Sequence, residues 1–222
     1  MRERIVVRKH ERINYSKNTF YTLLHTHHDK DNYIDYHWHN SIEITYVVKG
    51  LKVQCMEDEK IIAPTGTLLL VNSGVIHDID VKNGLEGIVL LIDRDYIDSI
   101  CPKCKDHGFS LKTNLDASKE IIDYLFKLVT AHEKNNLLDA HIIVLKIIKI
   151  LAEKLIVDGF YIKEKHDDES YELVISIIKY INQHYQQKIT LDKLALITNY
   201  NKSYLSNIFK KKTGITIFEY LR

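Results

Sequence analysis

The sequence predicts an α+β fold in which a sheet domain comes first and helices follow. Residues 1–95 contain short runs rich in Val and Ile that alternate with polar residues, which is the two-residue period of strands. After Asp95 the apolar residues recur about every 3.6 residues, the period of helices. The stretch from Ile189 to Arg222 then reads as two short amphipathic helices joined by a polar turn, which is a helix-turn-helix.

The first domain is expected to consist of short strands. They cover Phe20–His25, Ile42–Val48, Leu51–Met56, Thr67–Val71, Ile76–Val81 and Gly87–Ile92. Gly, Pro and Asn residues punctuate the connections between them. Short strands at this spacing predict an antiparallel sandwich or a small barrel.

Two long helices are expected after the sheet, near Leu115–His132 and Leu137–Val157. The second carries an apolar stripe that suits both core packing and contact between two subunits. Its members are Ile143, Ile147, Ile150 and Leu151. The segment Lys163–Glu169 has no apolar residue and is the candidate linker, and helices resume at Ser170.

Caps and apolar faces place the two helices of the helix-turn-helix. The first is expected to begin after Thr190. The second is capped by Asn201, whose side-chain oxygen can accept from a free backbone N–H, and it ends at Gly214. The residues expected in the core are Leu191, Leu194, Ala195, Ile197, Leu205, Ile208 and Phe209.

The outward face of the second helix combines short polar side chains with cations. Its residues are Lys202, Ser203, Ser206, Asn207, Lys210 and Lys211. Such a face can enter a major groove, where polar side chains meet base edges and lysines meet phosphates. A helical hairpin whose lysines are only solvated is the alternative that the pattern leaves open.

Charge is unevenly distributed along this chain of 222 residues, whose net charge is +1. From Tyr171 onward there are eight Lys and Arg residues against three acids, so the C-terminal part is basic and the remainder is acidic. A basic module attached to an acidic body favours binding of a polyanion such as DNA. The length suits two modest domains or one large one.

The sequence predicts no secretory or membrane-spanning segment, and the expected compartment is the cytoplasm. The first residues, MRERIVVRKHERI, are charged throughout. The most apolar run, Ile142–Val157, carries lysines and a glutamate on one helix face. Three cysteines, an odd number, fit a reducing compartment better than a disulfide framework.

The sharpest chemical signal in the sheet domain is His37-Trp38-His39 followed by Glu43. Successive side chains of a strand point to opposite faces, so His37, His39 and Glu43 are expected to share one side of a strand. Two imidazoles and a carboxylate on one face can form half of a cage for a divalent metal.

The C-terminal stretch resembles the first helix-turn-helix of the AraC/XylS family of bacterial transcription regulators. The matching residues are Leu191, Leu194, Ala195, Tyr204, Leu205, Ser206, Phe209, Lys210, Gly214, Phe218, Tyr220, Leu221 and Arg222. The resemblance implies that the serines and Asn207 of the outward face read bases and that its lysines contact phosphates. In that family a second helix-turn-helix follows, so we expect this chain alone to bind double-stranded DNA weakly.

Two segments of the sheet domain resemble the metal-binding motifs of the cupin family. One runs from His37 to Gly50 as H-x-H-x3-E-x6-G, and the other runs from Gly66 to His77 with Asn72 in place of a proline. The residues at the metal-ligand positions are His37, His39, Glu43 and His77. Sensor domains of AraC/XylS regulators often carry a similar string without an established metal. A metal site, a polar pocket without metal and a purely structural role therefore stay open.

Two further clusters give weaker signals. Cys101-Pro-Lys-Cys104 with His107 has zinc-like or redox-like spacing, but only three ligands lie close together and ordinary loop cysteines are expected. The three histidines within residues 25–28 are expected to be solvated, with the rim of a pocket as the alternative.

These features predict a ligand-responsive, DNA-binding transcription regulator and not an enzyme. The expected parts are a cupin-like sensing barrel (1–95), a helical dimerisation region (96–162), a linker (163–169) and one helix-turn-helix half of a DNA-binding domain (170–222). A small polar effector, such as a sugar, is expected to bind among the four motif residues without metal or cofactor and to act by rearranging a homodimer. The alternative is a metal-dependent cupin enzyme, a dioxygenase or an isomerase, that uses those same residues.

Overall fold

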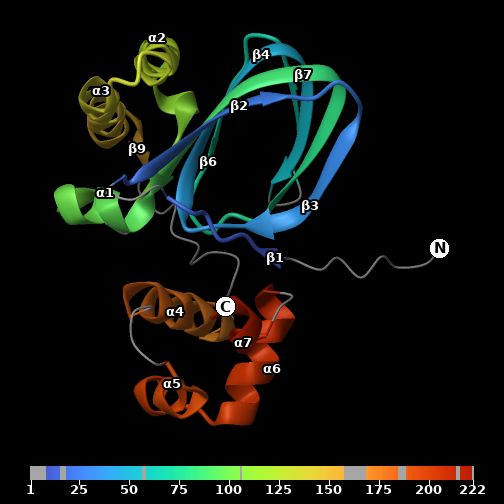
Figure 1. Cartoon of the computed structure of the whole chain (residues 1–222), viewed down its shortest axis with the longest axis vertical. Coiled ribbons are helices and arrows are strands. Elements are labelled where there is room, and N and C mark those ends of the chain that lie inside the picture. The colour runs from blue at the N-terminus through green and yellow to red at the C-terminus, as the bar shows by residue number, and fades with distance from the viewer. Residues whose placement is uncertain are drawn as a thin grey trace.

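The computed structural model describes residues 9–15, 19–56, 59–105, 107–157, 169–184, 189–213 and 216–221. The first part of the chain is a seven-stranded sheet that curls on itself (Figure 1). Its strands are β1 (Lys9–His10), β2 (Tyr21–His27), β3 (Asn32–Trp38), β4 (Ser41–Met56), β5 (Glu59–Pro64), β6 (Leu68–Val71) and β7 (His77–Asp93). Their pairings within the described ranges are antiparallel, apart from the parallel pair of β1 with β3.

Strand β4 holds the sheet together because it pairs with β5, β6 and β7. The two strands expected over 42–48 and 51–56 are one bent strand. The bend contains Gly50, whose φ of 90° is easily adopted only by glycine. Strand β7 likewise joins two expected strands into one. The alternation rule does not predict β3, because its first four residues are exposed and mostly polar.

Apolar side chains lie on both faces of the sheet. On the outer face, Ile44 and Leu90 pack against α2 (Leu115–Glu133) and α3 (Leu137–Ile150), which cover the sheet on one side (Figure 1). On the inner face, Val47 and Val81 belong to a smaller apolar cluster. The inner face is also the face of Glu43 and Thr45, which alternate with Ile44 along β4.

The apolar stripe expected on the second long helix lies in the core of this chain. Its residues Ile147, Ile150 and Leu151 are buried against the sheet and α2, and Ile143 is partly buried. That helix ends at Ile150 and continues as one π-helical segment, Leu151–Leu155. The exposed apolar residues of α3 are Leu137, Leu138, Ile142 and Leu145, and the last three form a different row.

Short elements surround these helices. They are α1 (Arg94–Ile100), the 3₁₀ turns Pro102–Cys104 and Leu111–Thr113, and the two-stranded sheet of β8 (Gly108–Phe109) with β9 (Ile156–Val157). Residues 163–168 of the expected linker lie outside the described ranges. Glu169, which was expected to end the linker, already begins a helix. No helix within the described ranges is long and apolar enough to cross a bilayer.

The C-terminal part is a helical unit that lies beyond the end of the sheet formed by β1 and β3 (Figure 1). Its helices are α4 (Glu169–His184), α5 (Leu191–Thr198), α6 (Lys202–Thr213) and α7 (Ile217–Tyr220). Leu194, Leu205, Ile208 and Phe209 are buried in its core as expected. The expectation for Ile197 is wrong: this side chain is 42% exposed, because the core-facing side of the short helix α5 is already formed by Leu191, Leu194 and Ala195.

Candidate functional site

The four residues of the cupin-like motifs come together at one end of the sheet. His37 lies near the end of β3, His39 lies in the short connection to β4, Glu43 is on β4 and His77 begins β7. The expectation that the first three share a single strand is therefore wrong, because the chain turns at His39 and Asn40. They still converge, since β3 pairs with β7 so that His37 lies opposite His77.

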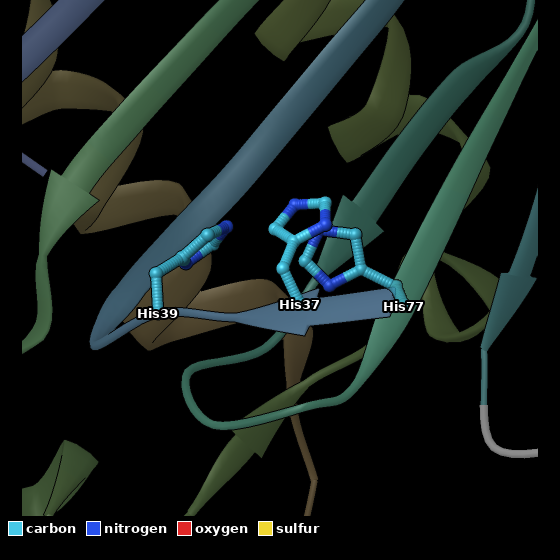
Figure 2. Close-up of side chains that lie close together, drawn as sticks. All are labelled: His37, His39 and His77. Carbon is cyan, nitrogen blue, oxygen red and sulfur yellow. The ribbon is translucent and has the colours of Figure 1, made fainter. Parts of the chain in front are cut away.

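The three imidazole rings face one another (Figure 2). Ring centroids lie 4.1 Å apart for His37 and His77, and 5.2 Å apart for His39 and His77. Each ring offers a nitrogen that lies within 4.8 Å of the nitrogens offered by the others, and all three side chains are buried. The arrangement has the donor type, number and spacing of a divalent transition-metal site.

A backbone carbonyl fixes the tautomer of each histidine. The Nδ1 atoms of His37, His39 and His77 lie 2.8, 3.2 and 2.9 Å from the carbonyl oxygens of Asp35, Ser41 and Val75. Because a carbonyl only accepts, Nδ1 of each ring donates, and a neutral ring then carries a bare lone pair on Nε2. Metal-binding histidines are commonly oriented by this kind of hydrogen bond.

Glu43 lies between the histidines and a buried lysine that sequence reasoning did not find. Its Oε2 is 3.2 Å from Nε2 of His39 and 3.6 Å from Nε2 of His77. Its Oε1 accepts from Nζ of Lys52 at 3.4 Å and from Oγ1 of Thr45 at 2.9 Å. Alternation would put Lys52 on the face opposite Glu43, but register irregularities between Val47 and Leu51 reverse this.

The ionisation of the cluster follows from burial and from the lysine. Burial, together with the neighbouring His77, lowers the pKa of His37 to about 4. Burial would raise the pKa of Glu43, but the Lys52 ammonium and the imidazoles of His39 and His77 outweigh it and hold the pKa well below its usual range. Near neutral pH the cluster therefore contains a carboxylate and an uncharged His37.

Two buried polar groups of the described chain lack a hydrogen-bond partner in this region of β4 and β7. They are Nε2 of His77 and the side-chain amide of Gln54, both with 0% exposure. Gln54 follows Lys52 by two residues and so points to the same side of β4. A buried polar group without a partner is costly, and a bound ligand can provide one.

Trp38 connects this end of the sheet to the helical unit. It is 2% exposed and belongs to the apolar cluster of α4, α5 and α6, together with Val174, Ile177 and Phe209. The two histidines beside it in the sequence point the other way, into the cluster described above. One short segment thus contributes side chains to both sites.

The segment that contains β1 runs along the same boundary. Glu11 donates its backbone N–H to the carbonyl oxygen of Trp38 at 2.8 Å, and its Oε2 lies 3.5 Å from Nε2 of His37. The guanidinium of Arg12 lies 5.9 Å from the centre of the Tyr220 ring in α7. The sequence alone does not indicate a role for Glu11 or Arg12, because their contacts depend on the pairing of β1 with β3.

The helix-turn-helix is formed by α5 and α6, with the expected caps. Thr190 accepts from the N–H of Lys193 at 3.2 Å, and Asn201 accepts from that of Tyr204 at 2.8 Å. Between the helices Asn199 adopts a left-handed conformation, with φ of 58°, which asparagine tolerates better than most residues. Gly214, the expected end of α6, lies outside the described ranges.

The residues expected to contact DNA lie along α6. Ser203, Asn207, Lys210 and Lys211 are exposed, and Ser206 is half-buried. Lys202 is also exposed, but its Nζ forms an ion pair with Oδ1 of Asp192 in α5 at 2.7 Å. The face is polar and basic in its described part, as a DNA-reading surface requires.

The two weaker clusters lie apart from these sites. Cys101 and Cys104 are free, with Sγ atoms 2.7 Å apart, and Nδ1 of His107 bonds to the carbonyl oxygen of Lys105. Burial raises the pKa of Cys104 to about 12, which opposes thiolate chemistry. His27 is exposed and pairs with Asp29 at 2.7 Å.

Two family models match the chain along most of its described length. The model of the AraC-like ligand binding domain covers residues 20–145, more than half of the chain. The model of bacterial regulatory helix-turn-helix proteins of the AraC family covers residues 181–222. The chain belongs to the AraC family.

Relatives of this AraC-family chain include regulators of Bacillus subtilis (strain 168). It is 26% identical over 216 residues to the uncharacterized HTH-type transcriptional regulator YdeC, covering 85% of this chain and 69% of YdeC. It is 44% identical over 54 residues to the uncharacterized HTH-type transcriptional regulator YobQ, covering 24% of this chain and 21% of YobQ.

Solved structures with a similar sheet include a RmlC-like cupin from Shewanella frigidimarina. The identity is 19% and the TM-score 0.32, over 34% of this chain and 70% of that protein. KdgF from Halomonas sp. matches at 20% identity and a TM-score of 0.30, over 35% of this chain and 73% of KdgF.

The family settles the broad function of the chain. An AraC-type ligand-binding domain joined to a helix-turn-helix makes a ligand-responsive, DNA-binding transcription regulator. This family is not one of enzymes, so the alternative of a cupin dioxygenase or isomerase is not supported.

Proposed function

We propose that this AraC-family chain binds a small polar effector among His37, His39, Glu43 and His77 and passes that binding to the helix-turn-helix through Trp38. The observation that carries the proposal is the placement of Trp38. It lies in the apolar core of the helical unit, while the histidines on either side of it lie in the polar cluster.

The connection is physically direct. A ligand that pulls His37 and His39 together moves the end of β3, and Trp38 moves with it because all three share one backbone segment. Glu11 adds a second connection, since it contacts both His37 and the backbone of Trp38. A ligand shifts such an equilibrium only if it binds one arrangement more tightly than the other.

The effector is a small polar molecule or ion. Hydroxyls of a sugar-like metabolite would find acceptors on the imidazoles and a donor and an acceptor on the Gln54 amide. A cation would find the lone pairs and carboxylate of the cluster. Either class would give a partner to Nε2 of His77, which has no hydrogen-bond partner among the described residues.

The regulatory output is a change in how two helix-turn-helix units meet adjacent half-sites of DNA in the cytoplasm. We propose that two chains pair through α3, whose row of Leu138, Ile142 and Leu145 is apolar and exposed. The distance between the two recognition helices then depends on how each helical unit packs on its sheet.

On DNA, the outward face of α6 lies in the major groove. Ser203, Ser206 and Asn207 contact base edges, and Lys202, Lys210 and Lys211 contact phosphates. The assignment is supported by the exposure of five of these six residues: Lys202, Ser203, Asn207, Lys210 and Lys211. Lys202 must exchange its partner Asp192 for a phosphate, so it contributes less than Lys210.

Selection of duplexes from a random library, followed by affinity measurements at several salt concentrations, tests the proposal. A Ser206→Ala, Asn207→Ala pair should reduce sequence preference. Lys210→Ala should weaken binding to all duplexes and reduce the salt slope by about 1. The matched control is Lys60→Ala on β5, an exposed lysine of the sheet domain that lies outside both α6 and the proposed dimer contact. Binding that is unaffected by both α6 changes would refute the assignment of the DNA-reading face.

A further inference from the structure

We infer that Cys101 and Cys104 form a redox modification site, at which a low-molecular-weight disulfide converts the two thiols into an intramolecular disulfide bond. The pair lies where α1 ends and the 3₁₀ turn Pro102–Cys104 begins. This chemistry goes beyond the proposed function and does not depend on it. It requires two thiols in contact, one of which a dissolved oxidant can reach.

The two thiols are already in contact. Sγ of Cys104 donates to Sγ of Cys101 at 2.7 Å, and both cysteines are free. A disulfide bond is about 2.05 Å long, so the sulfur atoms need to approach by only about 0.7 Å. The backbone N–H of Cys104 donates to the carbonyl oxygen of Cys101 at 2.8 Å, and this bond closes the turn. The backbone therefore holds the sulfurs together before any oxidation.

The two cysteines differ in their access to solvent. Cys101 is half-buried, whereas Cys104 is 0% exposed, so a dissolved oxidant reaches Sγ of Cys101 first. The thiol of Cys104 points at that sulfur, which is the atom that it must attack in the second step. Burial, together with the contact with Cys101, raises the pKa of Cys104 to about 12, so Cys104 keeps its proton during the first step.

The oxidation proceeds in two exchanges. Cys101 gives its proton to solvent, and its thiolate attacks one sulfur of the oxidant R–S–S–R, which forms the mixed disulfide Cys101–S–S–R and releases RS⁻. This RS⁻ takes the proton of Cys104, whose Sγ then attacks Sγ of Cys101 and expels the second RS⁻. A proton from solvent makes the second RS⁻ a thiol. Two protein thiols are thus oxidised to one disulfide, and the small disulfide is reduced to two RSH.

The surroundings favour this redox chemistry over a structural zinc site. A structural zinc has four ligands. Within the described parts of the chain, no third His, Cys, Asp or Glu joins the two sulfurs in a group with metal-binding spacing. His107, the nearest candidate in the sequence, directs its Nδ1 to the carbonyl oxygen of Lys105 at 3.0 Å.

Arg94 connects the cysteine turn to the end of the sheet that carries the histidines. Its guanidinium donates to the carbonyl oxygen of Cys104 and lies 5.6 Å from the centre of the Phe109 ring. The backbone of Phe109 exchanges two hydrogen bonds of 2.9 Å with the amide of Asn72. Asn72 begins the loop from β6 to β7, and β7 starts with His77. Closing the disulfide moves the turn that Arg94 holds, so the change extends along this path.

The test is incubation of the whole reduced chain with oxidised glutathione, followed by counting of free thiols in denaturant. The chain has three cysteines, so the count should fall from three to one, and excess dithiothreitol should restore it. Trypsin cleaves after Lys103, between the two cysteines, so the two peptides should stay joined until a reductant is added. A count that stays at three, or a disulfide between two chains instead of within one, overturns the inference.

Single variants assign the roles of the two thiols. Cys104→Ser should retain one glutathione on Cys101, because no second thiol can release it. Cys101→Ser should take up none at Cys104, whose sulfur is buried. The control is Cys55→Ser on β4, which should leave the oxidation of the pair unchanged.

The unaltered chain decides the outcome if a variant does not fold. Joined tryptic peptides would support the pairing of Cys101 with Cys104. Glutathione that stays on Cys101 of the unaltered chain as a stable mixed disulfide would overturn the role of Cys104.

Hydrogen exchange of the reduced and the oxidised chain tests the path through Arg94. Exchange rates should change in α1 and in the loop from β6 to β7, and they should stay the same in α5 and α6, which lie outside this path. A change that is confined to α1 and the cysteine turn would overturn the connection to the sheet.

Discussion

His37 and Trp38 are neighbours on β3, and their side chains enter different cores. His37 is 7% exposed and lies in the histidine cluster inside the curled sheet, and Trp38 is 2% exposed and lies among the helices that carry the DNA-reading face. Because successive side chains of a strand point to opposite faces, these two adjacent residues can enter different cores. The end of β3 is therefore shared by the sensing and DNA-binding parts.

Replacing Trp38 with alanine should loosen the helical unit from the sheet. A buried aromatic side chain contributes about 3–5 kcal/mol to its core, and this one belongs to the same apolar cluster as Val174 and Ile177 of α4. Hydrogen exchange should become faster in α4 and α6 and stay slow in β4 and β7. Trp38→Phe, which keeps an aromatic ring, should give a smaller effect. Equal protection of α4 in Trp38→Ala would show that the helical unit does not depend on this contact.

Replacing Gln54 with leucine should stabilise the ligand-free protein. Its buried amide lacks a partner among the described residues, so removing it should raise the free energy of unfolding by about 1 kcal/mol or more. The contrasting variant is Asn72→Leu, because the Asn72 amide exchanges two hydrogen bonds of 2.9 Å with the backbone of Phe109. In urea unfolding, Gln54→Leu should have a higher free energy of unfolding than the parent, and Asn72→Leu should have a lower one. A destabilised Gln54→Leu would mean that the amide has a partner in solution.

Removing the ammonium of Lys52 should destabilise the ligand-free chain. Lys52→Met leaves the Glu43 carboxylate buried without a cation, at a cost of about 3–5 kcal/mol. Adding Glu43→Gln to this variant should recover part of the loss, because no buried charge is then left unpaired. Urea unfolding of the two single variants and the double variant measures the coupling. A double variant less stable than Lys52→Met alone would contradict this account of the pair.

Asp93 should make the stability of the chain depend on pH. It caps α1 by accepting from the N–H of Asp95 at 3.0 Å, and burial, with a contribution from Asp95, raises its pKa to about 6. The folded state then binds the proton more tightly than the unfolded state, so stability falls as the pH rises from about 4 to about 6 and stays lower above that range.

The Asp93→Asn variant should remove this dependence while keeping the cap, since asparagine is an equally good capping residue. At pH 7 it should be more stable than the parent by about 3 kcal/mol. Thermal unfolding at pH 4, 5, 6 and 7 checks both statements. Parallel pH profiles for the parent and Asn variant would exclude Asp93 as the titrating group.

The sequence predicts the order of sheet and helices, the helix-turn-helix caps at Thr190 and Asn201, and the identity of the cluster residues. Those features depend on local patterns, which are visible in a single sequence. The convergence of His37, His39 and His77 was expected only from resemblance, since it requires β3 to pair with β7 across a separation of 40 residues.

The features that sequence reasoning missed depend on how strands distant in the sequence pair and pack. In the sequence Lys52 is an ordinary charged residue of the strand expected over 51–56, and only the irregular pairing of β4 with β7 brings its Nζ to Glu43. Trp38 could be recognised as buried, but not as a member of the C-terminal core, because no local pattern reports packing between distant segments. Glu11 depends in the same way on the parallel pairing of β1 with β3.

The most direct test of the coupling uses Zn²⁺ as a probe of the cation class of effector. The affinity of the chain for one selected duplex is measured by fluorescence anisotropy with and without saturating ZnCl₂. The account predicts that the two dissociation constants differ by about 5- to 150-fold, the usual range for coupling between two sites. It also predicts that the difference disappears in Trp38→Ala. Equal dissociation constants in the unaltered chain, with Zn²⁺ bound at the histidines, would contradict it.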